Sequence, residues 1–168
     1  MIHASMFGAA TAAGAYMVIP LPPVPITLQT LLTGLSGALL GGRLGALSQV
    51  VYVLLGIIGL PVFAGGKAGL GVLFGPTGGY LLGFIAAGYL TGRLVESREK
   101  PGFLWVALSI LAGFGLIYLL GIAQLSLVAG LSLTKALSLG MIPFLVGDLL
   151  KVIAAALITL WIRDRIKT

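Results

Sequence analysis

Long apolar runs, separated by short clusters of proline, glycine and charged residues, dominate the chain. A membrane-spanning helix needs about 20 predominantly apolar residues, and six runs approach that length, the second and third being slightly short. All eight prolines fall at or near the ends of these runs, as expected because an interior proline removes a hydrogen bond and kinks a helix. The pattern therefore predicts six spans, at about residues 4–20, 27–42, 44–60, 77–95, 103–122 and 143–162.

The connections on one side of the predicted bundle are chemically richer than those on the other side. The first is PLPPVPITLQT, which is stiffened by four prolines, and the second is the glycine-rich stretch 61–80. The third, residues 123–142, is too apolar and too long for a plain loop. We expect it to lie along the membrane surface or to dip back into the protein, because unpaired backbone cannot face lipid.

Composition and charge support an all-α integral membrane protein. The 168 residues are 59% hydrophobic and 8% charged, whereas a soluble domain needs many more surface charges. With both termini placed in the cytoplasm, the external side carries two lysines, Lys67 and Lys135, and Lys151 lies within the last span. Basic residues favour the cytoplasmic side, so the net charge of +6 fits cytoplasmic loops and does not call for a nucleic-acid partner. The seven basic residues on the cytoplasmic side are Arg43, Arg93, Arg98, Lys100, Arg163, Arg165 and Lys167.

Several kinds of chemistry have no residues to perform them. The chain has no cysteine, and its one histidine, His3, lies at the N-terminus, so thiolate chemistry and a metal cluster are not expected. Lys67 in GGKAG is not followed by Ser or Thr, so it does not form a phosphate-binding loop. We therefore expect neither an enzyme nor a resident cofactor, and ATP hydrolysis would fall to another subunit.

Asp148 and Lys151 place one charge of each sign in the last predicted span. Each costs about 2.5–3.5 kcal/mol near the bilayer centre on insertion scales. Their spacing puts them on one helix face, roughly 8–12 Å below the outer end of the span. One interpretation is a self-neutralising pair that fixes helix packing. The other is a ligand anchor, which is favoured because a lone structural pair seldom recovers its desolvation cost; the pair would suit a ligand with an amide-like head and an acid tail.

Other polar and glycine residues are weaker candidates for a pocket. In FGPTGGY, the glycines permit close backbone approach, and Thr77 can cap the helix that follows, although a bare helix start is an open alternative. The remaining polar candidates either line a pocket or form interhelical hydrogen bonds. The full set of candidates beside the charged pair is Thr27, Gln29, Gln49, Tyr52, Gly75, Thr77 and Tyr80.

Small residues recur every four positions at the start of the first span. Such a strip lets another helix approach closely. It serves either internal packing or the docking of a partner membrane protein. Its members are Ala4, Gly8 and Ala12, with Ser5, Ala9 and Ala13 beside them.

Four strings resemble one family when they are taken in order on a six-helix chain. They are PVPITLQTL, GLPVFAGG, GPTGGYLLGF and GDLLK, and they resemble the BioY family, the biotin-specific substrate-binding S components of energy-coupling-factor (ECF) transporters. The resemblance covers essentially the whole chain and implies the S-component fold, a single transmembrane substrate-binding domain over 1–168, and a multi-pass place in a prokaryotic plasma membrane. It implies high-affinity capture of biotin from outside, with Asp148 and Lys151 in the ligand motif, a PVPITLQ lid and a glycine-rich wall from Gly75 to Tyr80.

The resemblance also implies partners. These are a transmembrane coupling protein, which the small-residue strip of the first span would face, and two ABC-type ATPases. Asp148 would accept from the ureido N–H groups of biotin, and Lys151 would serve either the ureido oxygen or the carboxylate. The alternatives are an S component for another vitamin and a stand-alone secondary transporter with Asp148 as an ion or proton site, although no convincing inverted repeat supports the latter.

Overall fold

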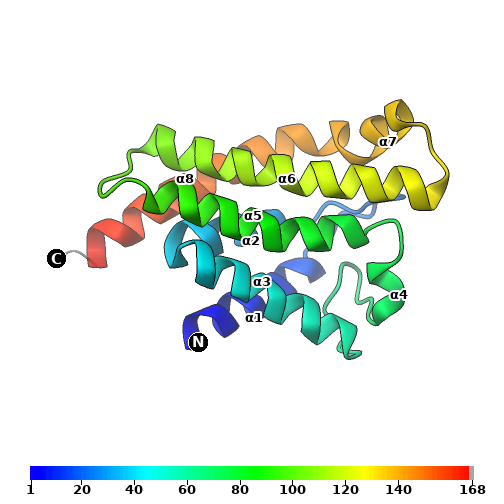
Figure 1. Ribbon diagram of the computed structural model, residues 1–168, viewed down its shortest axis with the longest axis horizontal. Helices are drawn as coiled ribbons and strands as arrows, with labels where there is room; N and C mark the ends of the chain where they lie inside the picture. Colours follow the sequence, from blue (N-terminus) through cyan, green and yellow to red (C-terminus); the bar gives the residue numbers. More distant parts are fainter. Residues whose placement is uncertain (167–168) are drawn as a thin grey trace.

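The computed structural model describes residues 1–166, and Lys167, counted above among the cytoplasmic basic residues, lies outside the described residues. The described chain is helical and contains no β-strand, only two isolated bridges, so the predicted all-α class is confirmed (Figure 1). The elements are α1 Ile2–Tyr16, α2 Gln29–Leu40, α3 Gly42–Ile57, α4 Leu70–Leu73, α5 Gly78–Glu96, α6 Phe103–Ala129, α7 Leu133–Gly140, η1 Ile142–Phe144 and α8 Leu145–Ile166.

Each of the six predicted spans corresponds to one of the longer helices, with shifted ends. α1 stops at Tyr16, before the proline-rich connection, whereas α6 continues to Ala129 and ends where Gly130 adopts φ 63°. Among the described residues, only two stretches are long and apolar enough to cross a membrane on length and hydropathy alone: Phe103–Ala129, which is α6, and Leu133–Arg165, which takes in α7, η1 and nearly all of α8. The count of six spans therefore stays a prediction.

The connection 123–142 is mostly helical. Its first part belongs to α6, and α7 then turns back beside α6 at one end of the molecule (Figure 1). Ala136 of α7 is fully buried, and the Tyr80 hydroxyl of α5 donates to the Gly140 carbonyl at 2.9 Å. This segment therefore satisfies its backbone within a helical hairpin, whereas the sequence predicted a surface-lying or re-entrant connection.

Glycines allow α2, α3 and α5 to meet backbone to backbone. A Cβ atom added at Gly45 of α3 would lie 2.7 Å from the Cα of Gly37 in α2 and 2.9 Å from the carbonyl oxygen of Gly88 in α5. Helices in membranes gain packing energy from such close approach, because lipid provides no hydrophobic drive between them. This contact joins α3 to α2 and α5, the two of these helices that line the pocket described below.

A buried polar cluster ties α1 to α2 and α3. The Gln49 amide nitrogen donates to the hydroxyls of Thr11 at 3.3 Å, Ser36 at 3.2 Å and Ser48 at 3.1 Å, and its oxygen accepts from Thr33 at 3.2 Å. All five side chains are fully buried. Of the two roles left open for Gln49, the structure shows the interhelical hydrogen bonds.

The two termini lie at the same end of the bundle, and α4 and α7 lie at the opposite end (Figure 1). This arrangement is compatible with both termini on one side of a membrane. The end that holds α4 and α7 corresponds to the predicted external side, and is called the loop end below.

Candidate functional site

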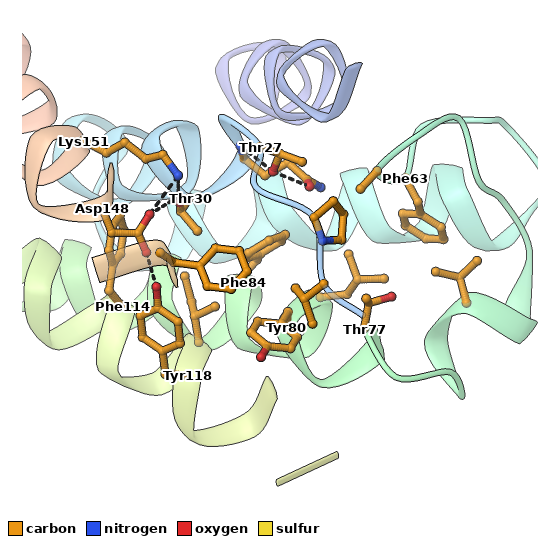
Figure 2. A pocket seen from close by; sticks show the side chains of 18 of the residues that line it. Thr27, Thr30, Phe63, Thr77, Tyr80, Phe84, Phe114, Tyr118, Asp148 and Lys151 are labelled. Atoms are coloured by element: carbon orange, nitrogen blue, oxygen red, sulfur yellow. Dashed lines mark hydrogen bonds and ion pairs between the residues drawn. The ribbon is translucent and has the colours of Figure 1, made fainter. Parts of the chain in front are cut away.

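A pocket of about 70 Å³ lies among α2, α5, α6, α8 and the two connections at the loop end. Figure 2 shows its side chains: the polar group of Asp148, Lys151 and Thr30 lies at one end, and Phe63 and Thr77 lie at the other. Between them the walls are mostly apolar and aromatic, with Phe84 and Phe114 facing the interior. An apolar pocket with a few convergent polar groups is the usual form of a small-molecule site.

Asp148 and Lys151 form a closed hydrogen-bonded group with two further residues. The Lys151 ammonium lies 2.8 Å from Asp148 Oδ1 and donates to the Thr30 hydroxyl at 3.0 Å. Thr30 in turn donates to Asp148 Oδ1 at 3.2 Å, and the Tyr118 hydroxyl donates to Asp148 Oδ2. Asp148 is 5% exposed and Lys151 is 9% exposed. Each charge therefore has a partner within the protein, which is the condition for burying both.

The local sequence explains the place of this pair. α8 begins at Leu145, so Asp148 lies in its first turn, where the positive end of the helix dipole stabilises an anion. Lys151 is three residues further along the same face and reaches back to it. The sequence identified the pair because placing charges in a membrane span costs free energy. It did not identify Thr30 or Tyr118.

Thr30 and Tyr118 carried weak sequence signals. Each is a polar residue within an apolar helix, and such residues commonly form ordinary interhelical hydrogen bonds. A search for hydroxyls at the depth of Asp148 in the other helices would have raised both as candidates. Their importance depends on the rotation of α2 and α6 toward α8, which the sequence pattern alone does not determine.

Three other predicted residues are linked by hydrogen bonds beside the pocket. Thr27 donates to the Gln29 side-chain oxygen at 2.8 Å, and the Gln29 amide donates to the Tyr52 hydroxyl. Thr27 and Gln29 line the pocket. Tyr52 is fully buried behind them, and its ring meets Phe63 edge-on with centroids 5.7 Å apart. Tyr52 therefore supports both loop-end connections, the one carrying Thr27 and the one carrying Phe63, and it does not line the pocket.

The glycine-rich stretch contributes to the pocket unevenly. Thr77 and Tyr80 line it. Thr77 occupies the N-cap position of α5, but its side chain makes no capping hydrogen bond, so the predicted side-chain cap is wrong. Gly75 lies just behind the lining residues, where its carbonyl accepts from the Gln124 amide at 2.8 Å. Gln49, in its cluster with α1, also lies outside the lining.

The small-residue strip of α1 divides into two faces. Ala4, Gly8 and Ala12 are buried, and a Cβ added at Gly8 would lie 3.0 Å from the Ser48 carbonyl of α3. Ser5, Ala9 and Ala13 are exposed on the adjacent face. The first three therefore pack internally, and the other three face away from the bundle.

A bundle of apolar helices with a largely apolar pocket and a buried ion pair near one end defines a membrane-embedded ligand-binding protein. The whole chain, residues 1–168, matches the model of the BioY family, and the chain belongs to that family. The predicted resemblance is thereby confirmed.

Individual relatives agree with this assignment. A biotin transporter BioY of Thermotoga maritima is 47% identical over 160 residues, covering 95% of this chain and 93% of that protein. A probable biotin transporter BioY of Pyrococcus horikoshii is 39% identical over 154 residues, covering 92% and 90%. The crystal structure of the S-component for biotin from an ECF-type ABC transporter matches with a TM-score of 0.88 at 27% identity, covering 97% of this chain and 89% of that one. The S-component fold is therefore confirmed as well.

Proposed function

We propose that this protein is the membrane-embedded biotin-binding subunit of a vitamin uptake system. The observation that carries the proposal is the closed group of Asp148, Lys151, Thr30 and Tyr118 at one end of an otherwise apolar pocket. Membership of the BioY family, with relatives named as biotin transporters, supports the same ligand.

The chemistry of biotin suits both parts of the pocket. Its ureido group has two N–H donors and one strong acceptor, which match the Asp148 carboxylate and the donors of Lys151, Thr30 and Tyr118. Its thioether ring and methylene tail are apolar, and they would lie among the aromatic and aliphatic walls around Phe84 and Phe114. Hydrogen bonds to ionised groups are the strong ones, so the charged end would dominate recognition. Binding would exchange some bonds of the Asp148 group for bonds to the ligand.

The chain would work with partners and not as an enzyme. As an S component it would pair with a transmembrane coupling protein and two ABC-type ATPases, which hydrolyse ATP. The exposed face of α1 that carries Ala9 and Ala13 would meet the coupling protein, because small residues allow close helix approach. The setting would be a prokaryotic plasma membrane, crossed several times, with the pocket open to the outside.

Titration of the purified protein tests this proposal. We expect biotin to bind with one-to-one stoichiometry, and riboflavin and thiamine to give no heat at the same concentrations. Binding of either other vitamin without biotin would show a different ligand. Biotin uptake into liposomes holding this chain alone, driven by an ion gradient, would favour the secondary-transporter alternative instead.

A further inference from the structure

A second lysine reaches the pocket from the end opposite Asp148. Lys67 lines the pocket, and its side chain is exposed. Its backbone carbonyl accepts from the Phe63 amide at 3.0 Å, which places it beside Phe63, at the far end of the pocket from Lys151 (Figure 2). From the sequence, Lys67 is predicted only to be an external basic residue, and it has no part in the Asp148 group.

The backbone that carries Lys67 is held firmly. Gly65 and Gly66 both have positive φ, 72° and 75°, which glycine adopts at little cost and which folds the chain into a tight turn between Phe63 and Lys67. The amide of Gly69 donates to the Gly56 carbonyl of α3 at 2.7 Å. The Phe63 ring lies so close over Gly56 that an added Cβ would come within 2.1 Å of it. The backbone at Lys67 therefore has a fixed position at the end of the pocket opposite Asp148. This end is called the mouth below, because Lys67 is exposed there, and the end at Asp148 is called the floor.

The two lysines differ in their electrostatic surroundings. Lys151 is neutralised by Asp148 at 2.8 Å, and an incoming carboxylate at that end would face the Asp148 carboxylate, so like-charge repulsion would oppose it. Lys67 takes part in no ion pair within the described residues. The N-terminus of α5, which follows Thr77, lies at the same end of the pocket, and its dipole also favours an anion. An anionic group is therefore favoured at the mouth and disfavoured at the floor.

The length of the pocket suits a ligand that reaches both ends. Lining residues run from Thr77 to Phe84 along α5, which is roughly 10 Å at the rise of an α-helix. A bicyclic head extended by four methylenes and a carboxyl group has a comparable length. The hydrophobic stem of Lys67 can cover the tail while its ammonium stays in water.

We propose that Lys67 is the specificity residue for the acid end of the ligand: it binds the biotin carboxylate at the pocket mouth, while the Asp148 group holds the ureido head at the floor. This inference rests on the proposed function and assigns each charge of the pocket to one end of the ligand. It also defines a wider ligand class, since biotin amides extended at the tail would pass through the mouth and lose only the contact with Lys67.

The test compares biotin with its methyl ester and its N-propyl amide, which lack the negative charge, on matched variants. Wild-type protein should bind biotin about fivefold more tightly than the ester, as expected for one partly exposed ion pair, and raising the salt concentration should reduce that preference. Lys67→Gln should abolish the preference, and Lys67→Glu should reverse it. Lys135→Gln, which changes an exposed lysine of α7 outside the pocket, should leave it intact.

The outcomes separate this inference from the proposed function. If the wild-type protein does not bind biotin at all, the proposed function fails. If it binds biotin but Lys67→Gln keeps the preference over the ester, Lys67 does not read the carboxylate. The N-propyl amide should bind within about threefold of the ester; an amide that fails to bind while the ester binds would show that the tail is buried, and would overturn the assigned orientation.

Discussion

Replacing Asp148 with leucine should separate the structural role of the charged pair from its ligand-binding role. The change leaves the Lys151 ammonium, 9% exposed, with only the Thr30 hydroxyl at 3.0 Å as a partner. Breaking one side of a buried pair costs about 3–5 kcal/mol. At about 2–4 °C per kcal/mol for a chain of this size, the midpoint of thermal unfolding should fall by roughly 10 °C.

The double variant Asp148→Leu with Lys151→Met should recover most of that loss. Replacing a buried pair with apolar side chains of similar volume is often neutral or stabilising. The Tyr118 hydroxyl then lacks its acceptor, which costs about 1–3 kcal/mol, and adding Tyr118→Phe removes that penalty. Biotin binding, by contrast, should be lost in the single variant and should not return in the double or the triple variant.

Thermal unfolding in lipid nanodiscs and calorimetric titration of the same samples give both readouts. Recovery of stability without recovery of binding is the expected signature of a ligand anchor. A double variant that binds biotin as tightly as wild type would show that the pair only fixes helix packing. A single variant with unchanged stability and affinity would contradict the buried geometry itself.

Three further changes probe other parts of the molecule. Gly45→Ala should lower the unfolding midpoint by several degrees, because its Cβ would lie 2.7 Å from the backbone of α2, whereas Gly115→Ala, with nothing within 4 Å, should not; equal midpoints would contradict the packing. Gln124→Leu removes hydrogen bonds to the Leu73 and Gly75 carbonyls and should weaken biotin binding about threefold to tenfold, with an unchanged affinity showing that these bonds do not position the pocket wall. Ala9→Phe should reduce biotin uptake by cells while leaving titration of the isolated protein unchanged, and normal uptake would exclude this face of α1 from docking.

Much of the fold could be predicted because proline positions and apolar runs carry local information. The long helices follow from them, and their ends shift by only a few residues, as for α1, or run on to the next glycine, as α6 does to Gly130. α7 was missed because its eight residues are too short to form a span and too apolar to read as a loop. Its position depends on tertiary contacts, such as the bond from Tyr80 to Gly140.

Site residues could be predicted from the sequence only where burying the residue costs much free energy. Asp148 and Lys151 stood out because charges in a span require compensation, and the structure brings them together. Gln29 and Gln49 looked equivalent in the sequence, yet Gln29 lines the pocket and Gln49 bonds among α1, α2 and α3. The difference is the rotation of each helix about its axis, which glycine contacts and neighbouring helices set. Lys67 was missed for a related reason, since only the turn at Gly65 and Gly66 directs it to the pocket.

The hydrogen bonds within the Asp148 group affect which ligands the pocket accepts. Asp148 accepts from Lys151, Thr30 and Tyr118, so a ligand gains only the difference between its own bonds and those that it replaces. A ligand that displaces these bonds without supplying matching partners leaves buried charges unpaired, which is far more costly than the gain from a correct match. The closed group therefore contributes less to the absolute affinity for the right head group than it does to the rejection of a wrong one. An apolar pocket without it would bind many hydrophobic molecules from the surrounding lipid.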